Sequence, residues 1–400
     1  QSASVTSSNV SPVGVLLALP SQPVHSLEIF IDSLNVTSSE ASEKQSQSQS
    51  RSRGCYIFSA STTSIHQLNL RMTNLIISAI GDPAVGADFS KMNEITDSTI
   101  YVEGDIRSHS PVGGITFDVF VAPTLSSLIN STIEFVGTLN SLSWAEVNAG
   151  IYLLLDSDDT SSISPKISST TIHADVIGNT TDGILVGIVI ESTTYNYQTI
   201  GMVWEDVTIL CEGSLTTLNG TSFGTLIGVF TSLGMTNVDI TSVANVSGNT
   251  ATQIIMSSVQ SGNWSEVSMY GGGKVIGDAV VGIIFSRVEF EDVEVSNLEL
   301  RGRSEMECGS GRCYGIWWDG VQMTQSTMID SIIEFDGMMI DSTDGSDDAT
   351  IPIGIHWNGG SGSSIESSTL RNVSLLSTNS KGIELVDLGN VTFCLVKVIS

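Results

Sequence analysis

Basic side chains are scarce in this sequence, and charge of either sign is sparse. Of the 400 residues, 15 are Lys or Arg and 43 are Asp or Glu, so the net charge is −28. Only 14% of the residues are charged. An acidic surface repels nucleic-acid phosphates and anionic lipid headgroups. The composition therefore argues against a nucleic-acid partner and against a role at a membrane surface.

Long hydrophobic runs are also missing. The longest apolar stretches, such as GILVGIVI (183–190), fall far below the roughly 20 residues that a membrane-spanning helix needs, so we expect no membrane insertion. The sequence begins at Gln1 without a basic leader. This start suits a mature chain whose signal has been removed, although a chain cut for another reason would look the same. The run VGVLLAL (13–19) is expected to be a first strand.

Hydroxyl side chains are abundant, since the chain has 62 Ser and 36 Thr. With 40% hydrophobic residues the chain is too apolar to be disordered, and hydroxyls with attached sugars would keep its surface soluble. Nine Asn-x-Ser/Thr sequons occur, against about five by chance. The sequon at Asn9 is followed by Pro12, which makes it a poor acceptor. We predict glycosylation at the other eight asparagines, Asn35, Asn130, Asn179, Asn219, Asn245, Asn263, Asn372 and Asn390.

Five cysteines bear on the compartment. Cys308 and Cys313 flank a Gly-rich loop, and we predict a local disulfide between them, with two free thiols in a cytosolic loop as the alternative. Cys55, Cys211 and Cys394 leave one thiol unpaired, which is either buried or links two chains. The acidity, the sequons and the cysteine pair together predict an extracellular protein, secreted or at the cell surface.

One short pattern recurs along the chain: Gly, then Ile or Val, then alternating residues. Nine copies span 268 residues in eight steps, a mean spacing near 33 with steps from 25 to 41. Eight of the nine copies begin with Gly. The copies are GITFDV (114–119), GIYLLL (150–155), GIVIES (187–192), GVFTS (228–232), QIIMSS (253–258), GIIFSR (282–287), GIWWDG (315–320), GIHWNG (354–359) and GIELVD (382–387).

A second kind of strand lies between these copies, as in STIYV (98–102), STIEF (131–135) and SIIEF (331–335). Apolar residues alternate with Ser, Thr or acids, which is typical of a strand with one buried face. Coils of such strands stack and share one core, so the pattern predicts a parallel β-solenoid. The alternative, an array of β-sandwiches, would repeat nearer to about 100 residues.

Two columns of the repeat are predicted to face the core, and only Thr231 breaks their apolar character. The residue after the Gly forms the first column: Ile115, Ile151, Ile188, Val229, Ile254, Ile283, Ile316, Ile355 and Ile383. The residue two positions further forms the second: Phe117, Leu153, Ile190, Thr231, Met256, Phe285, Trp318, Trp357 and Leu385.

Two segments, 315–337 and 354–377, carry a resemblance to known proteins. GIWWDGVQMTQSTMIDSIIEFDG and GIHWNGGSGSSIESSTLRNVSLLS resemble GLUG-type repeats, a Gly-rich strand, a turn and an Ile-x-x-Ser strand. More broadly, residues 95–395 are similar to pectin-lyase-like surface proteins, although the doubled Gly of GLUG repeats is missing and the coil length is uneven. The resemblance implies an all-β fold, a right-handed parallel β-helix (β-solenoid) of roughly ten coils with variable loops. It also implies a surface or adhesive role.

We predict a single solenoid domain over residues 1–400. Residues 38–53, SSEASEKQSQSQSRSR, form a low-complexity insert rich in Ser and Gln. We expect a solvated loop between two N-terminal coils, with contact to a neighbouring chain as the alternative.

Catalytic and metal-binding patterns are not found. The sequence from Asn179 to Gly183 approximates the Asn-Thr-Asp motif of polygalacturonases with an extra Thr, but their Gly-His-Gly and Arg-x-Lys elements are absent. Acidic clusters at 156–159 and 341–348 offer oxygens for Ca²⁺ but match no calcium loop, so we interpret them as solvated turns. The five His show no metal-ligand spacing. We therefore predict no catalytic residue, no metal site, no cofactor and no enzymatic activity.

The residue between the two inward columns should face outward. Six consecutive apolar residues in this position would form a stripe of roughly 25–30 Å, given the spacing of stacked strands. Monomeric proteins seldom expose such a stripe, so we predict an interface with another chain. Coverage by the chain's own loops and a ligand stacked on Tyr152 and Trp317 are the alternatives. The interface residues are Tyr152, Val189, Phe230, Ile255, Ile284 and Trp317.

These features predict a non-enzymatic extracellular structural glycoprotein that self-assembles into a filament or surface layer. Its partners would be copies of itself and covalent glycans. The sequence finishes on a predicted strand without a polar cap, NVTFCLVKVIS (390–400), and we expect head-to-tail docking to pair such exposed edges. The alternative function is a cell-surface adhesin or glycan-binding β-helix module.

Overall fold

In a computed structural model of the chain, every described element is a β-strand, and the strands pair in parallel ladders. The predicted all-β parallel solenoid is thereby confirmed. The structure describes residues 3–7, 12–38, 51–80, 82–117, 125–142, 147–155, 166–192, 201–309, 311–341, 352–358, 368–371, 374–378, 382–386, 391–394 and 397–399.

The chain divides into two compact units, which are described separately. Unit 1 consists of Gln1–Asp156, Pro165–Thr193 and Cys211–Thr221. Unit 2 consists of Ser157–Ser164, Thr194–Leu210 and Ser222–Ser400. The single domain expected from the sequence stays a prediction.

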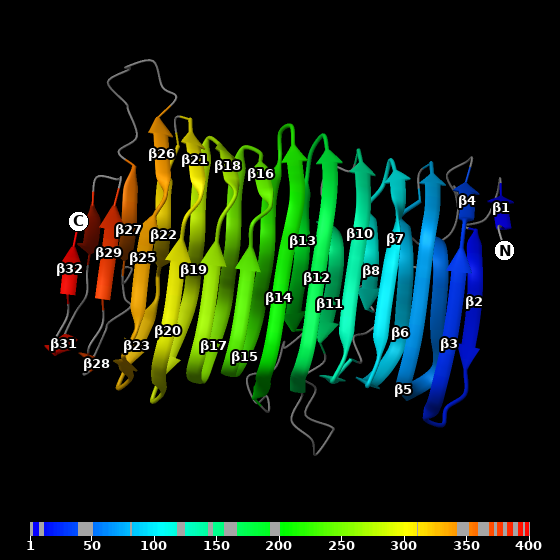
Figure 1. The fold of residues 1–400 in the computed structure, drawn as a ribbon, viewed down its shortest axis with the longest axis horizontal. Helices are drawn as coiled ribbons and strands as arrows, with labels where there is room; N and C mark the ends of the chain where they lie inside the picture. The colour runs from blue at the N-terminus through cyan, green and yellow to red at the C-terminus, as the bar shows by residue number, and fades with distance from the viewer. Residues whose placement is uncertain are drawn as a thin grey trace. The chain divides into compact units, whose positions relative to one another are not determined.

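Each unit stacks six strands of the repeat in parallel on one face, which we call the glycine face although β17 has Gln253 in the glycine position (Figure 1). The number of coils differs slightly from the roughly ten predicted, and the fold class matches. In unit 1 the strands are β2 (Val13–Leu19), the start of β5 (Ser52–Ala79), β6 (Ala84–Thr96), β8 (Val112–Phe117), β11 (Val147–Leu155) and β13 (Ile184–Ser192). In unit 2 they are β15 (Thr221–Ser242), β17 (Thr250–Gly271), β19 (Ala279–Glu291), β22 (Cys313–Asp319), β27 (Ile353–Asn358) and β30 (Ile383–Val386).

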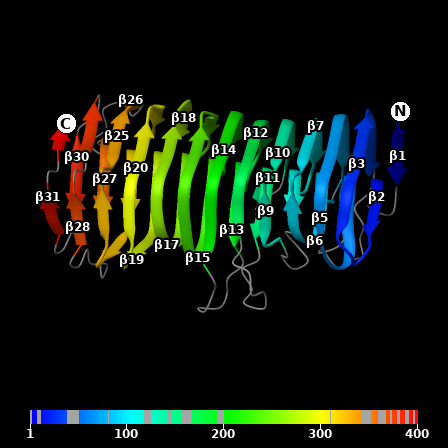
Figure 2. The ribbon, with the colours of Figure 1, turned by 60° about the horizontal axis from the view of Figure 1, so that its bottom comes forward.

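The other strands form the remaining faces of the coils. In unit 1, β7, β10 and β12 lie side by side in register (Figure 2). The strands outside the glycine face of unit 1 are β1 (Ala3–Ser7), β3 (Val24–Asp32), β4 (Leu34–Ser38), β7 (Thr99–Ser108), β9 (Ser127–Ile129), β10 (Thr132–Ser141) and β12 (Lys166–Thr180). β14 (Met202–Thr217) contributes residues to both units.

Unit 2 has shorter strands beside its glycine face. They are β16 (Asn245–Ser247), β18 (Lys274–Gly277), β20 (Glu294–Gly302), β21 (Glu305–Cys308), β23 (Gln322–Thr324), β24 (Thr327–Ile329), β25 (Ile332–Asp336), β26 (Met338–Asp341), β28 (Ser368–Arg371), β29 (Ser374–Thr378), β31 (Val391–Cys394) and β32 (Lys397–Ile399).

Close approach between coils explains the repeated glycine. A Cβ placed on Gly86 would lie 2.5 Å from the carbonyl oxygen of Gly114, and one on Gly114 would lie 2.4 Å from that of Gly150. Only glycine permits this approach of two backbones. The same contact occurs at Gly14 and Gly54, so the repeat begins about a hundred residues earlier than the sequence pattern indicates.

The inward columns are buried in most coils, as predicted, but one coil is offset. Val229 is exposed whereas Phe230 is buried, the reverse of the prediction. The glycine of this coil is Gly224 and not Gly228, because a Cβ on Gly224 would lie 2.6 Å from the Gln253 carbonyl oxygen of the next coil. A second departure is Leu385, which is exposed.

Buried hydroxyls tie the turns of successive coils together. Ser98 Oγ donates to the Thr96 carbonyl at 2.7 Å and accepts from the Leu68 N–H at 2.9 Å. Ser131 Oγ accepts from the Ser98 N–H at 3.2 Å in the same way. Part of the high serine content therefore satisfies backbone groups that the turns leave unpaired.

The predicted insert is shorter than residues 38–53. Ser38 ends β4, and Ser52 begins β5. Arg51 and Arg53 are buried and bonded to Asp88, so this end of the insert belongs to the core of the fold. Residues 39–50 lie outside the described part of the chain.

Candidate functional site

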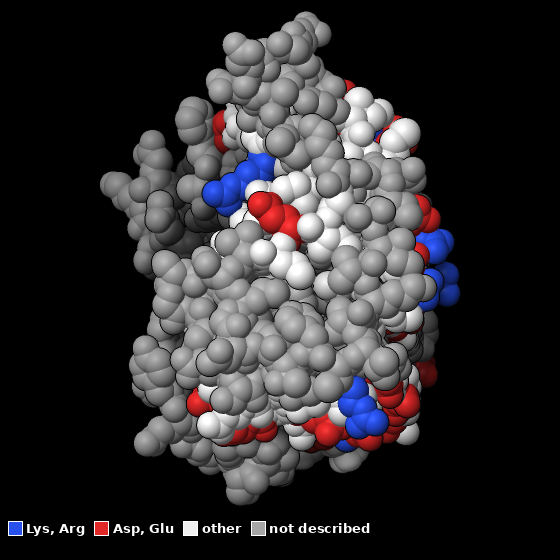
Figure 3. All heavy atoms as spheres, turned by 90° about the vertical axis from the view of Figure 1, so that its left-hand side faces the viewer, with Lys and Arg blue, Asp and Glu red and all other residues white. Residues whose placement is uncertain are grey.

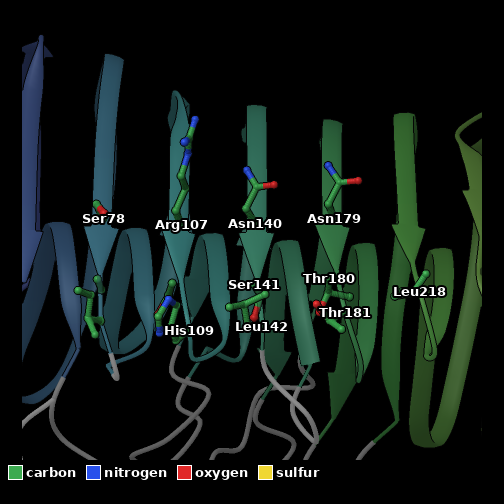
Figure 4. A pocket seen from close by; sticks show the side chains of 13 residues that line it. Ser78, Arg107, His109, Asn140, Ser141, Leu142, Asn179, Thr180, Thr181 and Leu218 are labelled. Carbon is green, nitrogen blue, oxygen red and sulfur yellow. The ribbon is translucent and has the colours of Figure 1, made fainter.

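A groove of about 530 Å³ crosses neighbouring strands of unit 1 at the end of β5, β7, β10 and β12 (Figure 4). Register places its residues in rows, because Arg107 pairs with Ser78 and Asn140, and Asn140 pairs with Asn179. The lining residues are Ser78, Ala79, Ile80, Arg107, Ser108, His109, Asn140, Ser141, Leu142, Asn179, Thr180, Thr181 and Leu218.

The groove has a polar wall, an apolar wall and a floor of buried hydroxyls. Side chains two residues apart on a strand point to the same side, so the row from Ser78 to Asn179 and the row that contains Leu142 flank the middle row from Ala79 to Thr180. Between them, Ser108 Oγ donates to the Asp82 carbonyl at 2.6 Å and Ser141 Oγ donates to the Ser110 carbonyl at 3.0 Å. The floor hydroxyls are thus satisfied within the chain, and the walls are left for a ligand.

The one arginine of the groove is largely neutralised by its neighbour. Arg107 Nε donates to Asp105 Oδ1 at 3.0 Å. Partial burial would raise the pKa of Asp105, but hydrogen bonds from Arg107 and Thr138 outweigh it, so the pKa is lowered. The same pair raises the pKa of Arg107. Polar donors beside an apolar wall, with little net charge, suit a neutral hydroxyl-rich ligand such as a sugar.

A second candidate site is an aromatic cluster on the glycine face of unit 2. The ring centroids of Tyr314 lie 5.1 Å from Trp317 and 4.8 Å from His356. Arg312 lies over the Trp317 ring at 5.0 Å, and His356 Nδ1 lies 2.8 Å from Glu384 Oε2. Burial raises the pKa of the Tyr314 phenol, although the charge of Arg312 opposes it. All three rings are half-buried, and sugars stack on aromatic faces of this kind.

The six predicted interface residues do not form a continuous exposed stripe. Val189, Phe230 and Ile284 are only 1%, 3% and 8% exposed, and an apolar side chain covered in this way has little area left for a partner. Phe230 does not occupy the outward position of its coil, because the glycine of that coil is Gly224 and the pattern is shifted along the sequence. Tyr152, Ile255 and Trp317 are half-buried.

Tyr152 has a partner in its own unit. Its hydroxyl donates to Glu191 Oε2 at 2.7 Å. Burial raises the pKa of the phenol, and the negative charge of Glu191 raises it further. Tyr152 is therefore a neutral hydrogen-bond donor within the fold.

Every predicted glycosylation site in the described residues has an exposed asparagine. Asn372 and Asn390 lie outside the described residues. The six exposed asparagines are Asn35, Asn130, Asn179, Asn219, Asn245 and Asn263.

The predicted disulfide is confirmed: Cys308 at the end of β21 is bonded to Cys313 at the start of β22. Cys55 and Cys211 are both buried. Burial raises the pKa of the Cys55 thiol to about 12, with a smaller effect from Asp88. The Cys394 side chain lies outside the described residues.

Most of the two acidic clusters, 156–159 and 341–348, also lies outside the described residues. Within the part that is described, no group of three or more His, Cys, Asp and Glu is placed to hold a metal ion. Asp182 lies in the turn after β12, where its carbonyl accepts a hydrogen bond from Thr180 Oγ1 at 2.7 Å. None of the described residues forms a helix long and apolar enough to cross a membrane.

Two polar clusters of unit 1 escaped the sequence analysis. Asp88 accepts hydrogen bonds from Arg51, Arg53 and Thr116, all of them buried. The sequence signal for this cluster was the pair Arg51 and Arg53 in a chain with few basic residues. Their acidic partner, Asp88, lies 35 residues beyond Arg53 in the sequence, so the pair alone did not identify it.

The second cluster is a row of three titratable side chains across three coils. His173 Nδ1 lies 3.1 Å from Glu134 Oε1, and its Nε2 lies 3.1 Å from Glu212 Oε2. A neutral imidazole has one N–H, so only the doubly protonated ring can donate to both carboxylates. The only sequence signal for this cluster was that Glu134 and Glu212 each lie 39 residues from His173.

Two basic side chains of unit 2 lie beside acidic ones. In Figure 3 the few Lys and Arg atoms lie close to Asp or Glu atoms. Lys274 Nζ, for example, lies 3.3 Å from Glu307 Oε2, and Arg301 lies beside Glu334 at 3.7 Å. Searches among protein-family models and among curated proteins found no match to the chain.

Proposed function

We propose that this chain is a non-enzymatic structural glycoprotein located outside the cell, whose solenoid acts as a scaffold that carries N-linked glycans. The observation that carries the proposal is that the asparagine of all six described sequons is exposed. A glycan needs an exposed asparagine, because an attached sugar is bulky and hydrated.

Hydrogen bonds of the sequon asparagines are compatible with this role. Asn245 Oδ1 accepts from the Lys274 N–H at 3.1 Å, and Asn263 Oδ1 accepts from the Glu294 N–H at 3.0 Å. A glycan is attached at Nδ2, so both bonds persist in the modified protein. Asn130 differs, since its Nδ2 donates to Asp97 Oδ1 at 2.6 Å.

Expression with a secretion signal in a eukaryotic host, followed by glycopeptide mass spectrometry, tests the proposal. We expect secreted protein with glycans on most of the six asparagines, and the lowest occupancy at Asn130, because its Nδ2 is already engaged. Unmodified asparagines in secreted, folded protein would overturn the proposal.

Self-assembly and the surface location remain parts of the proposal. The resemblance to pectin-lyase-like surface proteins with GLUG-type repeats supports a surface location. Lateral packing through all six stripe residues loses support, because three of them are buried. Negative-stain electron microscopy of the secreted protein tests assembly: filaments or sheets are expected, and isolated particles at all concentrations would contradict it.

A second candidate function, glycan binding, is favoured by the cluster of Tyr314, Trp317 and His356. A glycan array with the secreted protein tests it. Trp317→Ala should abolish a binding signal, whereas Phe30→Ala, which removes an exposed aromatic ring of unit 1, should leave the signal unchanged. Equal loss in both variants, or no signal with the unsubstituted protein, would exclude this candidate.

A further inference from the structure

One predicted glycosylation site differs from the others, because its asparagine lines the groove of unit 1. Asn179 ends the polar row and is followed by Thr180 in the floor and Thr181 in the opposite wall. The exposed Asn35 of the same unit is not among the lining residues. In Figure 4 the Asn179 amide points the same way as the side chains of Asn140 and Arg107, so a sugar attached to it starts beside the polar row.

Leu218 lies on the coil after Asn179, and the rest of the groove extends from Asn179 across the preceding coils. Asn140, Arg107 and Ser78 follow at successive strands of the ladder. At the usual strand spacing, three steps cover about 14 Å. This length accommodates the first sugars of a glycan laid across the strands.

The walls provide what an N-acetylhexosamine needs on its two sides. Hydroxyl and acetamide groups find hydrogen-bond partners in the Asn140 amide and in the Arg107 guanidinium. The apolar face of the ring and the acetamide methyl find Leu142 and Leu218, which are 50% and 70% exposed. Burying these two side chains is favourable, since exposed apolar area costs free energy in water.

We propose that the N-linked glycan of Asn179 lies in this groove, packed against Leu142 and Leu218 and hydrogen-bonded to Asn140 and Arg107, so that the groove is a site for the protein's own sugar. This inference rests on the proposed function, because it requires that the chain be glycosylated. A docked glycan is less accessible to processing enzymes than one that projects into solvent.

Site-specific glycan analysis of the intact secreted chain tests the inference, with Asn35 as the matched control in the same unit. We expect unprocessed oligomannose glycans at Asn179 and processed glycans at Asn35. Native protein should also lose the Asn179 glycan to peptide-N-glycosidase F about tenfold more slowly than the Asn35 glycan, the factor that a docking free energy of about 1.4 kcal/mol gives. Equal processing and equal release rates would overturn the inference.

A double variant opens the groove and leaves the sequon intact. Asn140→Ala with Leu142→Ser should remove the difference between Asn179 and Asn35 in both measurements, and an unchanged difference would overturn the docking. An Asn179 without glycan on a chain glycosylated at Asn35 would also refute the inference, while the proposed function would stand. A chain with no glycan at any site would refute the proposed function itself. If the double variant does not fold, the comparison of release rates in the unsubstituted protein decides the question.

Discussion

The two units build the same kind of coil around different polar chemistry. On the glycine face of unit 1, buried Asp88 accepts hydrogen bonds from Arg51 at 3.2 Å and from Arg53 at 2.6 Å. The core of unit 2 contains indoles, with the rings of Trp318 and Trp357 4.2 Å apart. Unit 1 thus buries charge that is paired, whereas the fully buried indoles of the described residues all lie in unit 2.

The buried indole N–H groups of unit 2 differ in whether they have a hydrogen-bond acceptor. Trp264 Nε1 donates to the Leu233 carbonyl at 2.8 Å. Within the described residues, the buried N–H groups of Trp204, Trp318 and Trp357 have no such partner, and each unpaired donor costs about 1–3 kcal/mol. The solenoid backbone therefore determines the direction in which each side chain points. The residues of each coil determine whether the buried polar atoms find hydrogen-bond partners.

The largest effect is expected from breaking the charge cluster of unit 1. Asp88→Ala leaves two buried guanidinium groups without their shared carboxylate, and we expect it to lower the free energy of unfolding by about 3–5 kcal/mol. Chemical denaturation measures the loss. Asp105→Ala is the control, because its pair with Arg107 is exposed and should contribute less than about 1 kcal/mol. Similar losses for the two variants would show that burial does not distinguish the pairs.

A second experiment examines what the two units share. Gly114→Ala in unit 1 and Gly282→Ala in unit 2 both place a Cβ 2.4 Å from a carbonyl oxygen of the next coil, so each should cost about 1–3 kcal/mol or more. Thermal unfolding measures the cost. Gly234→Ala, whose nearest neighbour would be 3.7 Å away, should be nearly neutral. A neutral result at Gly114 would refute the explanation of the glycine column.

A third experiment compares a buried indole N–H that has a hydrogen-bond acceptor with one that has none, both in unit 2. Trp264→Phe removes a donor and leaves the Leu233 carbonyl unpaired, whereas Trp318→Phe removes an N–H that has no partner. Both lose similar volume, so Trp318→Phe should be less destabilising by about 1–2 kcal/mol. Denaturation of the two variants side by side checks the difference. Equal losses would mean that volume alone decides the cost.

The smallest effect concerns the Cys55 thiol. Its pKa is raised from 9.0 to about 12 by burial, so the reactive thiolate is absent at pH 8 and iodoacetamide should not modify Cys55 in folded protein. Mass spectrometry of the Cys55 peptide, with denatured protein as the control, measures this. Because the folded pKa is the higher one, the neutral thiol's contribution to stability is complete below pH 9.0 and is lost as the pH rises toward 12. Rapid modification of folded protein at pH 8 would contradict the burial.

Local patterns allowed the fold to be predicted with some accuracy. Alternating apolar residues predicted the strands at 98–102 and 131–135, and β7 and β10 pair with Ile100 opposite Ile133. The exposed Val229 shows the limit of such patterns. Gly224 and Gly228 look alike in sequence, and it is contact with the next coil that identifies Gly224 as the member of the glycine column.

The candidate sites were less predictable, because their parts come from different coils. Arg107 and Asn179 are far apart in sequence and two strands apart in the ladder. Coil lengths vary, so the register that aligns them cannot be read from spacing. The sequon at Asn179 was visible, but the groove around it was not.

Acidity, hydroxyl content, the sequons and the strand period depend on composition and on neighbours within a few residues, so they could be read from the sequence. The pair of Asp88 with Arg53, the groove beside Asn179 and the burial of Ile284 appear only in the folded chain. They depend on coil stacking, because a parallel solenoid brings together residues separated by a whole coil. Contacts across coils are set by packing and register, which the local sequence does not encode.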